Sequence, residues 1–246
     1  MDKQRLVQTA QALVAEKKGI LAADESGGTI KRRFDSINVE STEKSRRDYR
    51  EMLFRTAGVS DFISGVILFD ETIRQEAADG TPIVKVLTDQ GIIPGIKVDK
   101  GTISLPSAPY ELVTEGLDSL RDRLTEYVEL GAGFTKWRAV ISITNDTPTS
   151  YGIAANAHAL ARFAALSQEA GLVPIVEPEV LRDGDHSIER CFEVTEETLR
   201  EVFDQLAQQK VLLEGMLLKP SMVISGGSST QRADPATPVE PVRAGN

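Results

Sequence analysis

Hydrophobic residues alternate between two patterns along this chain. Short continuous apolar runs occur at 20–24, 63–70, 92–99, 134–143, 173–180 and 216–223, and such runs are typical of strands covered on both faces. Between them, apolar residues three or four positions apart predict helices, as at 117–128, 153–164 and 199–206. Alternating strands and helices predict an α/β protein with a parallel sheet, either a barrel or an open doubly wound sheet.

Both patterns end near residue 223. Residues 224–246 are rich in Gly, Ser and Pro, so we expect a disordered tail after a single domain over 1–223. Pro235, Pro238 and Pro241 recur every third residue, which permits a polyproline II stretch. Such a stretch would suit a docking peptide, but nothing else in the sequence favours that reading.

The charge balance of the 246 residues narrows the possible partners. There are 28 Lys and Arg against 37 Asp and Glu, a net charge of −9, whereas surfaces that bind nucleic acid are basic. No apolar run is long enough to cross a bilayer, and none resembles a signal peptide. Cys191 is the single cysteine, which excludes an intrachain disulfide and suits a reducing compartment. We therefore expect a cytoplasmic protein that binds neither nucleic acid nor membrane.

Several common catalytic motifs are missing. The sequence contains no P-loop, no dinucleotide-binding glycine motif, no zinc-protease motif and no nucleophile elbow. His158 lies in a helical pattern and is expected to be an ordinary helix residue. His186 follows two aspartates, but the spacing matches no common metal site, so we predict a solvated turn.

Charged residues interrupt the apolar runs near their carboxyl ends. They lie on five of the six predicted strands: Asp24, Lys97, Asp99, Lys136, Arg138, Glu177, Glu179 and Lys219. Because an unpaired buried charge costs several kcal/mol, these groups must neutralise one another or serve a site. The carboxyl ends of parallel strands are where α/β enzymes place their chemistry.

This mixture of charges suits imine chemistry. Lys219 lies in an apolar run, and burial together with a nearby cation such as Lys136 would lower its pKa and expose a neutral amine. A neutral lysine attacks a carbonyl to form an imine, which acts as an electron sink for carbon–carbon cleavage. Glu177 or Glu179 could exchange the protons that imine formation requires, and Asp24 could take a proton from a substrate hydroxyl. An anionic group of the substrate could be held by two cations, Lys97 and Arg138.

Five segments, taken together, resemble class I fructose-1,6-bisphosphate aldolase. They occur in the same order as in that family, at 21–26 (LAADES), 95–101 (GIKVDKG), 136–138 (KWR), 176–179 (VEPE) and 217–220 (LLKP). The resemblance implies a (β/α)8 TIM barrel that cleaves fructose 1,6-bisphosphate to dihydroxyacetone phosphate and glyceraldehyde 3-phosphate in glycolysis and its reversal. It implies no metal or other cofactor, a sugar-phosphate substrate and a cytoplasmic homotetramer.

The resemblance also implies residue roles. Lys219 matches the imine-forming lysine. Glu177 matches the general acid and base of imine formation, with Lys136 and Glu179 supporting it. Asp24 matches the residue that serves the C4 hydroxyl when the C3–C4 bond breaks. Substrate- and phosphate-contacting positions are matched by Lys97, Arg138, Ser26, Thr29 and Arg33.

The chain departs from the family in length. Its strands recur about every 39 residues, so eight units would need more than about 300 residues and only six βα units are expected here. We therefore expect a C-terminally truncated barrel with unpaired strand edges, self-association and reduced activity. Two alternatives stay open: a catalytically dead remnant that acts only through subunits or partners, and a Schiff-base aldolase for a smaller sugar phosphate. The preference between bisphosphate and monophosphate is also open.

Overall fold

A computed structural model describes residues 2–230 of the chain. The strands are β1 (Gly19–Ala23), β2 (Ile63–Leu68), β3 (Ile93–Lys97), β4 (Thr102–Leu105), β5 (Ala108–Thr114), β6 (Phe134–Ile141), β7 (Val173–Val180) and β8 (Leu217–Leu218). The α-helices are α1 (Lys3–Leu13), α2 (Gly27–Asp35), α3 (Glu43–Phe54), α4 (Val59–Phe62), α5 (Asp70–Ile73), α6 (Ile83–Thr88), α7 (Leu120–Glu129), α8 (Ser150–Glu169) and α9 (Ile188–Gln208), and a 3-10 turn spans Leu213–Gly215.

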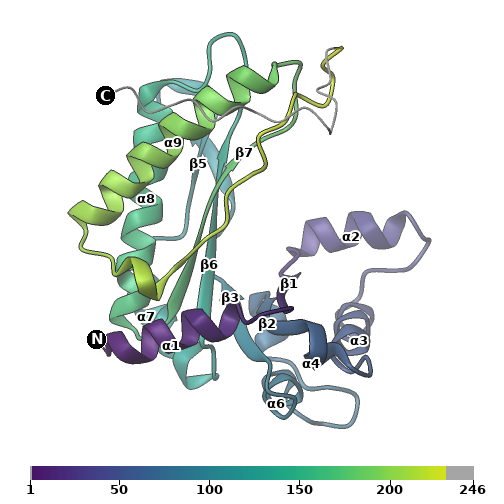
Figure 1. The fold of residues 1–246 in the computed structure, drawn as a ribbon. Coiled ribbons are helices and arrows are strands. Elements are labelled where there is room, and N and C mark those ends of the chain that lie inside the picture. The colour runs from purple at the N-terminus through teal and green to yellow at the C-terminus, as the bar shows by residue number, and fades with distance from the viewer. Residues whose placement is uncertain (1, 231–246) are drawn as a thin grey trace.

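The main sheet confirms the predicted fold class. Six parallel strands run in the order β1-β2-β3-β6-β7-β8, and the sheet curls as an arc of a barrel (Figure 1). The register places Lys97 beside Lys136 and Arg138 beside Glu177. The charged positions of neighbouring strands therefore lie at similar heights, as the sequence predicted.

Two long helices cover the outer face of the sheet (Figure 1). Each begins at a hydroxyl cap: Thr149 accepts from the Gly152 amide at α8, and Ser187 accepts from the Arg190 amide at α9. Behind β6, the Trp137 ring stacks on Phe163 of α8 at a centroid distance of 5.6 Å. This contact packs β6 against α8.

Helix α1 closes the amino end of the sheet. Its buried stripe of Leu6, Ala10 and Leu13 packs in a cluster with Phe134 and Ile175. Because this end is filled with apolar side chains, the carboxyl ends of the strands are left as the place for polar chemistry.

Two elements differ from the sequence prediction. Strand β8 contains only Leu217 and Leu218, rather than 216–223, and its ladder with β7 ends where the Lys219 amide donates to the Val176 carbonyl at 2.9 Å. The antiparallel β4–β5 hairpin was not predicted. Its side chains are largely exposed, as at Tyr110, so it lacks the apolar run by which the other strands were found.

The segment expected to be a disordered tail is described only to residue 230. Residues 226–228 lie against the loop after β7: the Gly226 amide donates to the His186 carbonyl, and the Ser228 amide donates to the Gly184 carbonyl. His186 is buried beneath this segment, so the solvated turn predicted for it is wrong. The positions of Pro235, Pro238 and Pro241 fall outside the described residues, and a domain boundary at residue 223 stays a prediction.

Candidate active site

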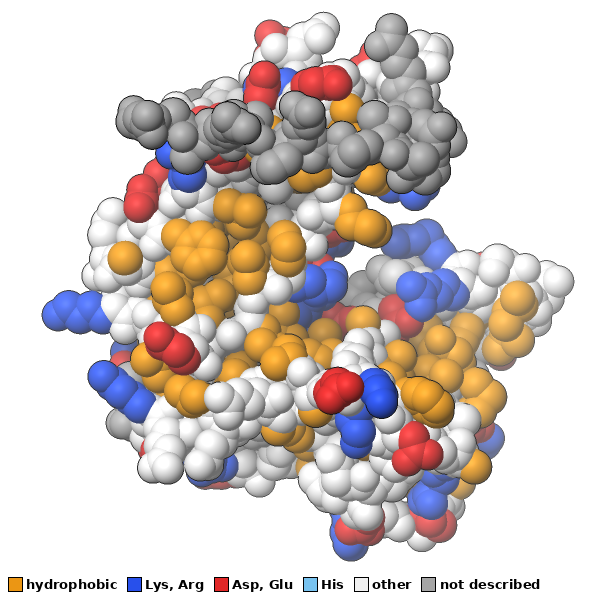
Figure 2. Space-filling model, in the orientation of Figure 1, with side chains coloured by type: hydrophobic (Ala, Val, Ile, Leu, Met, Phe, Trp, Pro, Cys, Tyr) orange, Lys and Arg blue, Asp and Glu red, His pale blue; other side chains and the backbone are white. Residues whose placement is uncertain are grey.

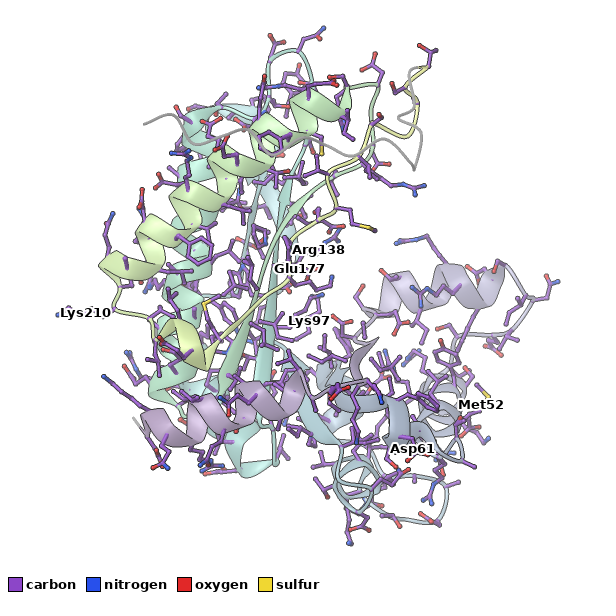
Figure 3. All side chains as sticks on the ribbon, viewed as in Figure 1. Met52, Asp61, Lys97, Arg138, Glu177 and Lys210 are labelled. Atoms are coloured by element: carbon purple, nitrogen blue, oxygen red, sulfur yellow. The ribbon has the colours of Figure 1, made fainter. Side chains whose placement is uncertain are left out.

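A cavity of about 820 Å³, lined largely by charged residues, lies at the carboxyl ends of the strands. Figure 2 shows Lys and Arg side chains gathered in the hollow between the sheet and α2, and Figure 3 places Lys97, Arg138 and Glu177 on that side of the sheet. Seven of the ten predicted site residues line the cavity: Asp24, Ser26, Thr29, Arg33, Lys97, Lys136 and Arg138. Residues 112 positions apart in the chain thus meet as the sequence predicted.

Lys136 lies at the centre of the charged cluster. Its Nζ is 2.9 Å from Asp24 Oδ2 and 3.0 Å from Glu177 Oε2, and all three side chains are largely buried. Burial alone would lower the pKa of Lys136, but the two carboxylates outweigh it and raise that pKa above its usual value. Lys136 is therefore a firmly protonated cation that bridges β1 and β7.

Lys219 meets the same glutamate from the opposite side. Its Nζ donates to Glu177 Oε1, so one buried carboxylate contacts two lysines. The Lys219 side chain itself is 55% exposed. The predicted burial of Lys219 is therefore wrong: β8 ends one residue earlier and pairs only with β7, so little packs around the lysine.

Two further ion pairs border the cavity. Arg138 pairs with Glu179, and Lys97 pairs with Asp99, which also accepts from the Gly101 amide at 3.3 Å. Glu179 thus contacts Arg138 rather than Glu177 or Lys219. The two glutamates of β7 therefore have different partners: Glu177 contacts the two lysines, and Glu179 contacts Arg138.

The first turn of α2 forms another side of the cavity. Ser26 is the residue at its N-cap, and its Oγ lies 3.2 Å from Thr29 Oγ1. Arg33 follows one turn later and pairs with Glu25. A helix N-terminus with two hydroxyls and an arginine is well suited to an anionic group.

Sequence reasoning missed a third group of cavity residues. Asp70 Oδ1 accepts from the Tyr127 hydroxyl at 2.7 Å and from Arg74 at 3.0 Å, and Arg123 lies beside them. Burial alone would raise the pKa of Asp70, but these two hydrogen bonds lower it below its usual value. A signal was present, because Asp70 lies two residues beyond β2 and because Arg123 and Tyr127 are one helical turn apart on α7.

Comparison with known proteins identifies the family. The family model described as "Glycolytic: Fructose-bisphosphate aldolase class-I" matches residues 5–240. The chain belongs to the class I fructose-bisphosphate aldolase family. It is therefore a lyase with the Schiff-base chemistry that defines class I aldolases, as the resemblance implied.

Individual aldolases agree with this assignment. A probable fructose-bisphosphate aldolase class 1 from Xanthomonas campestris is 60% identical, over 95% of this chain and 70% of its own. A cytosolic aldolase from Arabidopsis thaliana is 51% identical, over 97% of this chain and 67% of its own. The Plasmodium falciparum aldolase, solved with TRAP and an inhibitor, superposes with a TM-score of 0.92 at 50% identity, covering 94% of this chain and 67% of that one.

Metal clusters and membrane-spanning helices are both absent from residues 2–230. No group of three or more His, Cys, Asp or Glu side chains within 2–230 is placed to hold a metal ion. None of the helices in that part of the chain is both long and apolar enough to span a bilayer.

Proposed function

We propose that this chain catalyses the reversible cleavage of fructose 1,6-bisphosphate through an imine on Lys219. The observation that carries the proposal is the position of Glu177, whose buried carboxylate contacts Lys219 through one oxygen and Lys136 through the other. A carboxylate between two lysines can take a proton from one while the second cation holds it in place. Imine formation needs that combination of groups.

Imine formation begins with a proton transfer. Glu177 accepts a proton from Lys219, and the neutral amine attacks the C2 carbonyl to form a carbinolamine. Glu177 then returns the proton to the carbinolamine hydroxyl, which leaves as water and gives the iminium ion. Lys136 stays protonated throughout, because Asp24 and Glu177 raise its pKa, and its charge stabilises the carboxylate form of Glu177 before the first transfer and after the second.

Asp24 would serve the cleavage step. Its carboxylate lines the cavity and is held by Lys136, so it can accept the proton of the C4 hydroxyl. The electrons of the C3–C4 bond flow into the iminium, which becomes an enamine as glyceraldehyde 3-phosphate leaves. Protonation of the enamine at C3 and hydrolysis of the imine release dihydroxyacetone phosphate and regenerate Lys219.

Cations around the cavity rim would bind the phosphates of the sugar. Lys97 and Arg138 stand on β3 and β6, while Ser26, Thr29 and Arg33 are on α2. Each cation is paired with a carboxylate in the structure, so phosphate would compete with Asp99, Glu179 and Glu25 for its partner. Glu179 would support the site by holding Arg138 rather than by exchanging protons.

The enzyme would work without a cofactor, on a sugar phosphate, in the cytoplasm. In this mechanism the imine to Lys219 is the electron sink, so no metal or other cofactor is required. A sugar phosphate is the substrate, and a cytoplasmic, self-associating protein is favoured by the cytosolic Arabidopsis relative and by the exposed strand edges described below.

Borohydride trapping tests the central step. The chain is incubated with dihydroxyacetone phosphate, reduced with borohydride and mapped by mass spectrometry. We expect the label on Lys219, its loss in Lys219→Met, at least a tenfold lower labelling rate in Glu177→Gln, and no effect of a chelator. Lys85→Met, which changes an exposed lysine of α6, should label like the wild type.

The trapping result also separates the alternatives. Wild-type protein that takes no label would overturn the imine proposal and favour a non-catalytic role through subunits or partners. Label on Lys219 combined with cleavage of only a smaller sugar phosphate would retain the mechanism and reject the bisphosphate as substrate.

A further inference from the structure

A buried arginine behind the cavity contacts the loop that carries Asp24. Arg50 of α3 is fully buried, and it donates from one guanidinium nitrogen to the backbone carbonyl of Glu25 at 2.8 Å. The other terminal nitrogen donates to Thr72 Oγ1 at 2.6 Å. Glu25 lies two residues beyond β1, and Thr72 lies in α5, which follows β2, so one side chain joins the segments that follow two neighbouring strands.

The charges around Arg50 favour this position. Its guanidinium lies 4.0 Å from the Glu25 carboxylate and 3.8 Å from that of Glu71. Glu71 already accepts two hydrogen bonds from Arg46, from Nε at 2.9 Å and from Nη2 at 2.6 Å. Burial lowers the pKa of Arg50, and the two carboxylates partly compensate. Burying a guanidinium costs free energy because it loses its hydration. Packing alone could be supplied by an apolar side chain without that cost.

The loop has few other fixed supports. The pairing of β1 with β2 ends at Ala23, and β1 has no other partner in the main sheet of the described residues. Ser26 makes no side-chain capping hydrogen bond to α2. A cavity of about 240 Å³, bordered by Glu25, Arg50 and Phe69, leaves room behind the loop for it to retract.

The remaining contacts of the loop involve groups that engage substrate. Asp24 is held by Lys136, and Glu25 by Arg33. In the proposed function Asp24 turns to the C4 hydroxyl and Arg33 to a phosphate, so both contacts change during the reaction. The Arg50 contacts do not face the large cavity, so they can persist through every step.

We propose that Arg50 is a positioning residue for carbon–carbon cleavage: it fixes the loop of Asp24, Glu25 and Ser26 from behind. This inference rests on the proposed function, in which Asp24 takes the C4 hydroxyl proton. Arg50 touches neither Lys219 nor Glu177 in any contact of the structure, so imine formation should be independent of it. A loss of cleavage without a loss of imine formation is the signature of this role.

Two variants of Arg50 test the inference against one matched control. Arg50→Met keeps the length of the side chain and removes both donors, and Arg50→Lys keeps the charge with a single donor group. Arg47→Met changes the same helix, where Arg47 pairs only with the adjacent Asp48. For each variant we would measure bisphosphate cleavage, borohydride trapping of dihydroxyacetone phosphate on Lys219, and hydrogen exchange of residues 22–30.

The expected pattern is selective. Cleavage should fall roughly 10- to 100-fold in Arg50→Met, because small misplacements of a catalytic group cost that much. Trapping on Lys219 should stay within about twofold of wild type. Residues 24–29 should exchange faster, Arg50→Lys should be intermediate and Arg47→Met unchanged. Cleavage and trapping lost in equal proportion, or both unchanged, would overturn the inference.

The outcomes also separate this inference from the proposed function. A wild-type chain that neither traps nor cleaves refutes the proposed function, and hydrogen exchange then decides the role of Arg50 alone. Faster exchange at 24–29 in Arg50→Met and not in Arg47→Met supports loop positioning, and equal exchange rejects it. If Arg50→Met does not fold, the same comparisons apply to Arg50→Lys.

Discussion

Lys136 is the residue on which the electrostatics of the site depend. It neutralises two buried carboxylates, Asp24 and Glu177, from a position that is itself 7% exposed. Removing one member of such a group leaves the others buried without a counter-charge, which costs far more than an ordinary surface substitution.

We predict that Lys136→Met destabilises the chain by about 3–5 kcal/mol, measured by urea unfolding. Lys85→Met, at an exposed ion pair of α6, should change stability by less than about 0.5 kcal/mol. Adding Asp24→Asn to Lys136→Met should recover part of the loss, because one of the two uncompensated charges is then absent. A loss as small as that of the surface control would contradict the central role of Lys136.

The same residue predicts a pH dependence. The pKa of Lys136 is higher in the folded chain than its ordinary value of 10.5, so the unfolded chain releases this proton first as pH rises. Its contribution to stability is fully present below about pH 10 and is lost as pH rises through the raised folded pKa. The stability difference between wild type and Lys136→Met should therefore be constant from pH 7 to 9.5. A difference that shrank within that window would show that the pKa is lowered instead.

At the scale of elements, the β4–β5 hairpin is fixed to the helix that supports β6. Glu111 of β5 accepts from the Thr149 amide at 2.8 Å and from its hydroxyl at 2.6 Å, at the start of α8. Thr114, at the end of β5, donates to the carbonyl of Arg138. The hairpin thus links the N-terminus of α8 to the backbone of a residue that borders the cavity.

Gly152 leaves the room that this docking needs. Replacing it should therefore change stability in opposite directions with and without Glu111. Alanine is favoured over glycine in a helix by about 1 kcal/mol, but a Cβ at 152 would lie 2.0 Å from Glu111 Oε1. We predict that Gly152→Ala destabilises the chain by about 1–3 kcal/mol, because the buried carboxylate must move. In a Glu111→Ala background the same change should stabilise the chain by up to about 1 kcal/mol. Thermal unfolding of the four proteins checks the reversal, and a stabilising effect in both backgrounds would rule out the clash.

At the scale of the whole molecule, the sheet of the described residues has two free edges. β1 pairs only with β2, and β8 pairs only with β7. Edge strands with unpaired backbone groups are templates for association. This openness also explains why Lys219, which follows β8, is half exposed while Glu177 is buried.

We predict that the chain self-associates in solution. Sedimentation at micromolar concentrations should give an average mass that exceeds 26.8 kDa and rises with concentration. Because Cys191 is buried, a reducing agent should not change the result. A chain that stays monomeric at every concentration and unfolds in one cooperative transition would contradict this prediction.

The sequence alone determined the order of the βα units and the residue types at the carboxyl ends of the strands. Apolar runs and helical stripes are local signals, so they survive without knowledge of the fold, and the period of two places Lys136 with Arg138 and Glu177 with Glu179. The β4–β5 hairpin was not predicted, because its residues are largely exposed and do not form a continuous apolar run.

The tertiary structure alone decided which partner each charge meets. The strand pattern predicts that Glu177 and Glu179 share a face, but only packing across the sheet gives the first to the lysines and the second to Arg138. Burial of Lys219 was predicted from its apolar neighbours and is wrong, because solvation depends on the strands on either side rather than on residues adjacent in the chain. The contact of Arg50 with the Glu25 carbonyl spans 25 positions and no pattern marks it, since a buried arginine and an exposed one look alike in a helical sequence.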